Sequence, residues 1–553
     1  MPRLFDTHKD LLSKAVAAAH ERTYWSAFPE VPSGKIYGET AKAEGAAAFQ
    51  ARLGQPFQLP GHPNGGHVGS ETSPYGFALD ITYPDAGVPA LIDAATTAGQ
   101  GWAQASIEER LGVCLEILVR LNKMSFEMAK AVEHTTGQSF VMAFQAGGPH
   151  AQDRGLEALA YAYAEMTRTP AETVWTKPQG KAEPIVLEKR YRVVPRGIAL
   201  TIGCATFPTW NSYPGLFASL ATGNPVVVKP HPAAVLPLAM TVEVGRQVLQ
   251  EQGFDPNVLQ LAADAPGAEK TKELALHPAV KIVDFTGSNA FGAWLRENVA
   301  QAQLFTEEAG VNAIVVASTD DFHGLCANIA FSLSLYSGQM CTSPQNIYVP
   351  RGGIETDEGH KSCDEVAEGL AAAVDRLLAD PERAAGVCGA LASPATLQRV
   401  AEAVALGDIV RPSTPVAGLN EARTATPLIL KVDAAESDAH RQEHFGPIGF
   451  VVASDSAEDA IAEAAATAAE KGAITAAIYA TEEALLDRAA EAFGAAGVNL
   501  SCNLTGNIFV NQSAAFSDYH VTGANPAGNA CLTDAAFVAN RFRIATTRRP
   551  QAA

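Results

Sequence analysis

The pattern of apolar and polar positions changes along this chain, and each pattern predicts a different kind of element. From about residue 92 to 168, apolar residues recur every three or four positions, which predicts a run of helices. Residues 184–195 instead alternate apolar and polar side chains, which predicts a half-exposed strand. Residues 1–20 predict a short amphipathic helix, whereas the proline-rich residues 26–90 predict a long irregular segment.

After residue 197 the chain repeats a strand, a short loop and a helix. Apolar runs at 199–203, 225–228 and 281–285 predict the first strands, and a second series extends from 314 to about 510. This alternation is typical of doubly wound parallel sheets, whose ligands bind at the carboxyl ends of the strands. We therefore predict two α/β domains and a projecting strand.

The composition is that of a globular protein, since 47% of the 553 residues are hydrophobic and 18% are charged. A net charge of −20 argues against nucleic acid and anionic membranes as partners. No apolar stretch is long enough to span a membrane, and residues 1–20 do not read as a secretion signal. The eight cysteines form no CxxC pair, so we expect neither disulfides nor a metal site. A cytoplasmic protein is predicted.

Two residues could carry out a reaction, one as a nucleophile and one as a general base. Cys341 lies between a turn of small residues and a predicted strand, where its sulfur could act as a nucleophile beside free backbone amides. The alternative is a packed, inert thiol. Glu307 lies in segment 305–310, at the junction of the two domains, and could act as a general base if burial raised its pKa. The alternative is a solvated carboxylate in a turn.

Three further residues lie where a doubly wound sheet binds its ligand. Lys229 ends a predicted strand and could bind ribose hydroxyls or a phosphate, or could be a surface lysine. Gly287 and Ser288 precede a predicted helix, whose N-terminus suits a diphosphate. The usual GxGxxG dinucleotide motif is missing from the sequence.

In this order and spacing, the motifs resemble those of the aldehyde dehydrogenase superfamily. The family's KP lysine, FTGS segment, glutamate, GQxC cysteine and ExFGP segment correspond to Lys229-Pro230, Phe285–Ser288, Glu307, Gly338–Cys341 and Glu443–Pro447. The step of 34 residues from Glu307 to Cys341 matches the family's spacing. The resemblance covers about residues 90–515 and implies two doubly wound α/β domains with a β-hairpin oligomerisation arm.

The resemblance also implies a reaction. Cys341 would attack an aldehyde, a hydride would pass to NADP or NAD, and Glu307 would activate the water that hydrolyses the resulting thioester to a free acid. Glu443 would hold the nicotinamide ribose, and Phe445 would pack near the nicotinamide.

Two positions depart from the family pattern. Thr206 stands where the family has its oxyanion-binding asparagine, and Asn211, five residues on, is the second candidate for that role. Pro232 stands where NAD-preferring members often carry a glutamate, so NADP is permitted. Lys229 and His231 lie close enough in sequence to attract a 2′-phosphate. Gly287 and Ser288 would face the diphosphate.

The family pattern also implies a division of the chain. We expect a cofactor domain from 1–175 and 196–308, including an extended N-terminal segment 1–90, and a catalytic domain from 309–513. An oligomerisation element would combine 176–195 with 514–553, including an Arg-rich strand at about 537–549. A homodimer or homotetramer follows from such an arm.

The long N-terminal segment, Thr206–Pro208 and the tail motif at 519–525 resemble the PaaN type of phenylacetate-degradation enzyme. This finer resemblance implies a CoA-linked semialdehyde from an opened aromatic ring as substrate. Three alternatives stay open: a semialdehyde dehydrogenase of the benzoyl-CoA pathway, a catalytically silent binding scaffold, and a thioester hydrolase that uses Cys341 without redox chemistry.

Overall fold

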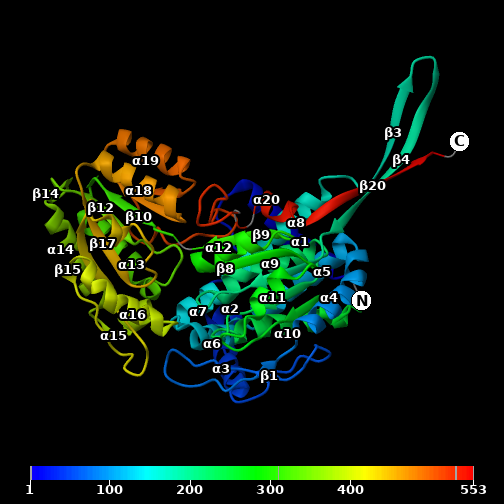
Figure 1. The fold of residues 1–553 in the computed structure, drawn as a ribbon, viewed down its shortest axis with the longest axis horizontal. Coiled ribbons are helices and arrows are strands. Elements are labelled where there is room, and N and C mark those ends of the chain that lie inside the picture. The colour runs from blue at the N-terminus through cyan, green and yellow to red at the C-terminus, as the bar shows by residue number, and fades with distance from the viewer. Residues whose placement is uncertain (1–2, 309, 530–531, 533, 552–553) are drawn as a thin grey trace.

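Two α/β units form the body of the molecule, and a three-stranded ribbon projects from one of them (Figure 1). The computed structural model describes residues 3–308, 310–529, 532 and 534–551. No helix in these ranges combines the length and apolar character needed to cross a membrane. The predicted doubly wound α/β fold is confirmed.

The first sheet has five parallel strands. Their order is β7 (Leu259–Leu261), β6 (Val226–Lys229), β5 (Ile198–Ile202), β8 (Val280–Gly287) and β9 (Gln303–Glu308). Every residue of β5, β6 and β7 is buried, which explains their continuous apolar sequence, because helices cover both faces of such sheets. The connecting helices are α9 (Pro208–Ala221), α10 (Leu236–Glu251), α11 (Lys270–Leu276) and α12 (Asn289–Asn298).

The helical run predicted before this sheet is present as five helices. They are α4 (Val88–Gln104), α5 (Ile107–Lys123), α6 (Ser125–Thr136), α7 (Phe140–Gly147) and α8 (Pro149–Thr167). Helix α1 (Leu4–Glu21) packs against α5 and α8. Helix α5 begins with a capping box between Ser106 and Glu109.

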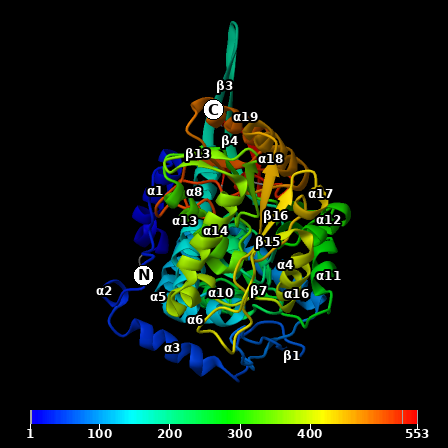
Figure 2. The same cartoon turned by 90° about the vertical axis from the view of Figure 1, so that its left-hand side faces the viewer.

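The prediction of an irregular segment at 26–90 is wrong in part. This segment contains α2 (Gly34–Tyr37), α3 (Ala41–Arg52) and the short strands β1 (His67–Val68) and β2 (Tyr83–Pro84). Helix α3 was obscured because it buries only Gly45 and Phe49, so its alanine-rich sequence shows no clear apolar face. Helix α3 and β1 lie at the end of the molecule opposite the ribbon (Figures 1 and 2).

The second sheet has seven strands, all parallel except the edge strand β15. Their order is β15 (Asp408–Arg411), β16 (Leu428–Asp433), β17 (Ile448–Ser454), β12 (Asn346–Pro350), β10 (Ala313–Val316), β18 (Thr475–Tyr479) and β19 (Asn499–Cys502). A small sheet of β11 (Ser318–Thr319), β13 (Ile354–Thr356) and β14 (Gly359–Lys361) lies beside it. The helices of this unit are α13 (Phe322–Ser334), α14 (Cys363–Leu378), α15 (Pro381–Cys388), α16 (Pro394–Ala403), α17 (Ser437–His440), α18 (Ala457–Lys471) and α19 (Glu483–Ala495).

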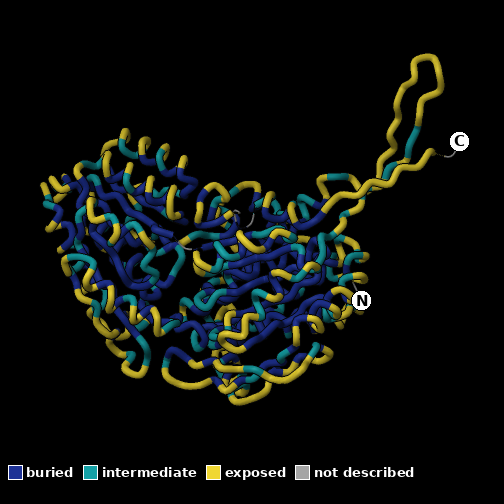
Figure 3. The backbone as a smooth tube through the Cα atoms, in the orientation of Figure 1, coloured by how far each residue is buried: buried dark blue, intermediate teal, exposed yellow. Residues whose placement is uncertain are grey.

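The projecting ribbon is antiparallel and joins distant parts of the chain. It consists of β3 (Glu172–Gln179), β4 (Ala182–Pro195) and β20 (Phe542–Pro550), with β4 in the middle. Most of its residues are exposed (Figure 3). The strand expected at about 537–549 is shifted, because residues 535–539 form helix α20 (Ala535–Ala539).

A buried ion pair fixes the C-terminal tail to the first sheet. Arg541 is fully buried, and its guanidinium donates to both carboxylate oxygens of Asp284 on β8, at 2.8 and 2.5 Å. The carboxylate lies directly beneath Gly215 of α9, where a Cβ atom would come within 2.5 Å of it. The tail therefore crosses the body of the molecule before it joins the ribbon, and its earlier part reaches the junction of the two units.

Candidate active site

Two cavities meet at Cys341. The larger has a volume of about 670 Å³ and the smaller about 490 Å³. Three residues line both cavities: Phe207, Asn211 and Cys341. A sulfur reached from two sides can face a different ligand on each side.

An unusual turn positions Cys341. Tyr336 and Ser337 have φ angles of 50° and 48°, a left-handed conformation that costs energy for residues with a side chain. Hydrogen bonds hold this turn in place: the Tyr336 hydroxyl donates to Thr136 O at 2.6 Å, and the Ser337 hydroxyl to Cys388 O at 3.1 Å. These hydrogen bonds therefore fix the backbone conformation just before the half-buried Cys341.

Glu307 lies in strand β9 and is only 1% exposed, so the alternative of a solvated carboxylate in a turn is wrong. Its Oε2 accepts from Asn211 Nδ2 at 3.0 Å, and its Oε1 lies 2.9 Å from His520 Nε2. Burial favours a raised pKa, but the charge and hydrogen bond of His520, with hydrogen bonds from Cys341 and Asn211, outweigh it and leave the pKa of Glu307 lowered. The raised pKa considered from the sequence is therefore not found.

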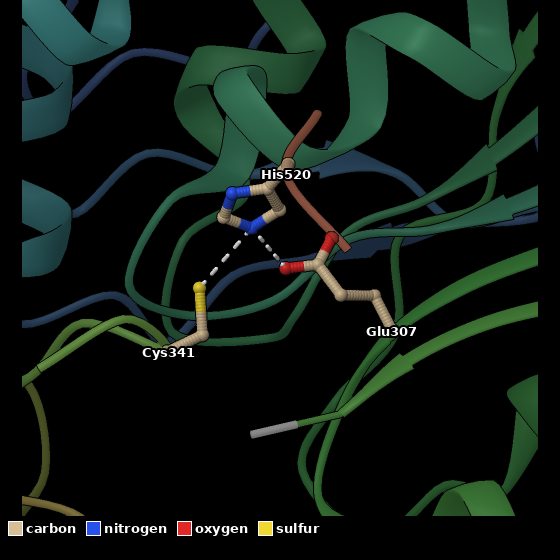
Figure 4. A group of neighbouring side chains, drawn as sticks. All are labelled: Glu307, Cys341 and His520. Atoms are coloured by element: carbon tan, nitrogen blue, oxygen red, sulfur yellow. Dashed lines mark hydrogen bonds and ion pairs between the residues drawn. The ribbon is translucent and has the colours of Figure 1, made fainter. Parts of the chain in front are cut away.

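Cys341 faces Glu307 and His520 (Figure 4). Its Sγ lies 3.5 Å from His520 Nε2. Burial, followed by the negative charge of Glu307, raises the pKa of Cys341 well above that of an ordinary thiol. His520 was not a predicted site residue; the only sequence signal for it was its place in the tail motif at 519–525.

The three donor atoms of Glu307, Cys341 and His520 lie within 4.8 Å of one another. The contacts of His520 Nε2 connect all three side chains.

The two candidates for the oxyanion role lie in different surroundings. Asn211 lines both cavities, and its amide nitrogen donates to Glu307. Thr206 lines only the smaller cavity, and its hydroxyl lies 3.9 Å from Cys204 Sγ. Asn211 therefore lines both of the cavities that reach Cys341. The oxyanion-binding role of Asn211 or Thr206 stays a prediction.

The smaller cavity collects all six residues predicted to bind a cofactor. They are Lys229, His231, Gly287, Ser288, Glu443 and Phe445. Strand β8 ends at Gly287, and the next residue, Ser288, caps the N-terminus of α12. Both residues line the cavity. Burial raises the pKa of Glu443 to about 7. Lys229 is buried and pairs with Asp264 at 2.7 Å.

The larger cavity has aromatic walls. Six Tyr, Trp and Phe side chains line it: Tyr24, Trp25, Phe207, Trp210, Phe331 and Phe509. Carboxylates of Glu30, Asp153 and Asp518 lie among them. Residues from 24–30 of the N-terminal segment belong to this wall, a role that the sequence did not indicate. Asp153 holds that segment in place, accepting from Ser26 Oγ at 2.6 Å and from the Ala27 amide at 3.0 Å.

Comparisons with known proteins agree with this geometry. The profile of the Aldehyde dehydrogenase family matches residues 82–519. The crystal structure of an NAD-dependent aldehyde dehydrogenase from Burkholderia multivorans is 54% identical, with a TM-score of 0.98, covering 100% of this chain and 99% of that chain. The N-succinylglutamate 5-semialdehyde dehydrogenase of Burkholderia cenocepacia is 27% identical over 69% of this chain and 75% of that protein.

A more distant structure shares the fold. The 1-pyrroline-5-carboxylate dehydrogenase of Thermus thermophilus is 19% identical, with a TM-score of 0.74, covering 96% of this chain and 99% of that chain. With the family profile spanning most of the sequence, and Cys341 and Glu307 side by side between two cavities, the superfamily resemblance read from the motifs is confirmed: this chain belongs to the aldehyde dehydrogenase family.

Proposed function

We propose that this protein oxidises an aldehyde to the carboxylic acid, using Cys341 as nucleophile and NAD or NADP as hydride acceptor. The observation that carries the proposal is the position of Cys341 at the meeting point of two cavities, one suited to a nucleotide and the other to an aldehyde. The similarity to a structure named as an NAD-dependent aldehyde dehydrogenase supports the cofactor.

The smaller cavity fits a nicotinamide nucleotide by the chemistry of its lining. Gly287 offers no side chain, and the ten-residue helix α12 presents its N-terminus to a diphosphate. Glu443 and Phe445 come from the second unit and would hold the nicotinamide ribose and ring. A nicotinamide held there would supply the acceptor for the hydride that leaves the carbon attached to Cys341.

The protein's own groups would act in two stages. In the first, the Cys341 thiolate bonds to the carbonyl carbon, and an amide such as that of Asn211 stabilises the oxygen. In the second, Glu307 takes a proton from a water molecule, whose oxygen attacks the thioester. The bond between carbon and Sγ then breaks, which releases the acid. The lowered pKa of Glu307 keeps it ionised and able to accept that proton.

For the substrate we propose, from the tail motif and Thr206–Pro208, a CoA-linked semialdehyde of aromatic ring opening. The aromatic walls of the larger cavity support an apolar chain next to the aldehyde. The same cavity is lined by the carboxylates of Glu30, Asp153 and Asp518 and by the guanidinium of Arg154. An uncharged aromatic aldehyde is the second candidate, favoured by the same aromatic lining.

The experiment follows reduction of NAD and of NADP by the purified protein with three aldehydes: a CoA-linked semialdehyde, phenylacetaldehyde and succinate semialdehyde. Oxidation of either of the first two in preference to the third is expected, and Cys341→Ala is expected to abolish it while nucleotide binding persists. Nucleotide binding without oxidation of any aldehyde would favour a silent scaffold. Thioester hydrolysis without nucleotide would favour a hydrolase.

We also propose a cytoplasmic homodimer or homotetramer that assembles through the ribbon, with the domain division at 175, 196, 308 and 513. Val174, Trp175 and Ile185 are exposed apolar side chains on the ribbon, which supports burial against another copy. An isolated hairpin is marginal in water, so a neighbouring sheet would stabilise it.

A further inference from the structure

A histidine from the tail stands between the proposed nucleophile and the proposed base. His520 lies between β19 and α20 and is 3% exposed. One atom, Nε2, makes both contacts: 3.5 Å to Cys341 Sγ and 2.9 Å to Glu307 Oε1 (Figure 4).

The surroundings of Cys341 create a problem that such a partner would solve. Burial and the adjacent carboxylate raise the pKa of its thiol, so that the reactive thiolate is disfavoured at neutral pH. Glu307 is assigned to the water of the second stage, and its oxygens already accept from Asn211 and contact His520. A thiol that must attack an aldehyde therefore needs another proton acceptor within contact distance.

We propose that His520 is a third catalytic residue, which accepts the Cys341 proton at Nε2 and stabilises the thiolate as an imidazolium. In this step the S–H bond breaks and an N–H bond forms, so that a thiolate and an imidazolium replace a thiol and a neutral ring. The 2.9 Å contact with the ionised Glu307 Oε1 requires a hydrogen on Nε2, so the contacts of the structure are those of the imidazolium after this transfer, and the negative charge of Glu307 stabilises it. The same cation stabilises the thiolate when it leaves the thioester.

The other ring nitrogen has a partner that suits both charge states. Nδ1 lies 3.5 Å from Ser513 Oγ, which accepts from Arg154 Nη2 at 3.1 Å. Because a hydroxyl keeps a hydrogen and a second lone pair after accepting one bond, Ser513 can accept from Nδ1 or donate to it. The ring can therefore gain and lose a proton without losing this contact.

The ring is also held in place before any substrate arrives. The Trp210 indole meets it edge to face, with centroids 4.6 Å apart. The backbone on either side is fixed, because Arg154 donates to Asp518 O at 3.1 Å and Asn499 donates to Tyr519 O at 3.0 Å. Such fixed geometry is what proton transfer between neighbouring groups requires.

The inference rests on the proposed role of Cys341, so its test measures the thiol without aldehyde or nucleotide. Iodoacetamide alkylation of Cys341 is quantified by peptide mass spectrometry across a range of pH, in the wild type and in His520→Gln. Glutamine can still donate an N–H to Glu307 but cannot take up a proton. We expect alkylation of the variant to fall at least ~10-fold at neutral pH and to recover at alkaline pH.

The charged and titratable groups facing His520 are Glu307 from β9, Cys341, and Arg154 from α8 through Ser513. An inflection below the alkaline range in the wild-type profile would report the pair of Cys341 and His520. His360→Asn, an exposed histidine on β14, is the matched control and should alkylate as the wild type does.

Two results would overturn the inference: equal alkylation rates in wild type and His520→Gln at every pH, or a wild-type profile that rises only in the alkaline range. The second result needs no variant, so a misfolded substitution does not prevent the test. A profile that shifts as expected in a protein that oxidises no aldehyde would sink the proposed function and leave the role of His520 intact.

Discussion

Replacing Arg541 by methionine tests whether the buried ion pair fixes the tail. Methionine keeps apolar bulk against the Phe305 and Phe537 rings, which lie 4.5 and 4.1 Å from the guanidinium carbon, and removes the charge. The variant loses both bonds to Asp284 and leaves that carboxylate without its cation in a buried site. Because breaking one side of such a pair typically costs about 3–5 kcal/mol, we expect a loss of that size.

Urea unfolding, followed by circular dichroism and tryptophan fluorescence, measures this loss. The double variant Arg541→Met with Asp284→Asn removes both charges and fits the space beneath Gly215, so it should recover at least about half of the loss. Arg351→Met, which breaks an exposed pair with Asp433, should leave unfolding unchanged. A loss below about 1 kcal/mol in Arg541→Met would refute the anchoring role.

Three further outcomes follow from the proposed function. Glu307→Gln should permit one burst of hydride transfer and then stall at the thioester, because an amide cannot take a proton from water; unchanged steady-state turnover would assign the base elsewhere. NADP should be preferred to NAD by about 10-fold in kcat/KM, or about 1.4 kcal/mol, since Pro232 places no carboxylate near a 2′-phosphate; side-by-side assays showing a strong NAD preference would contradict this. Light scattering should show an even oligomer, and deletion of 178–193 should yield aggregating monomers; a stable 57.9 kDa wild-type monomer would exclude assembly through the ribbon.

The sequence predicted best the elements that are buried on both faces. The strands at 199–203 and 225–228 were each found within a residue or two, because central parallel strands must be continuously apolar. Strand β7 has only three residues and was missed, since so short a run has no readable period. Helix α3 was missed because most of its surface faces solvent.

The site was predictable only where chemistry lies in compact motifs. Cys341 and Glu307 belong to short patterns at a characteristic spacing, and the structure places them together. His520 could not be found in this way, because it reaches Glu307 across 213 residues and no local pattern encodes that contact. The aromatic wall from residues 24–30 was hidden for the same reason, since packing of the N-terminal segment alone creates it.

The long sequence separation between Cys341 and His520 bears on when the Cys341 thiol can be oxidised. His520 contacts Cys341 across 179 residues, and contacts of such long range form only when most of the molecule has folded. With His520 as the proton acceptor, a partly folded or locally unfolded chain carries Cys341 as an unassisted thiol, which reacts slowly with peroxide because the thiolate is the reactive form. With His520 in contact, the native state would therefore carry more Cys341 thiolate, and there substrate and nucleotide can shield the sulfur from both cavities.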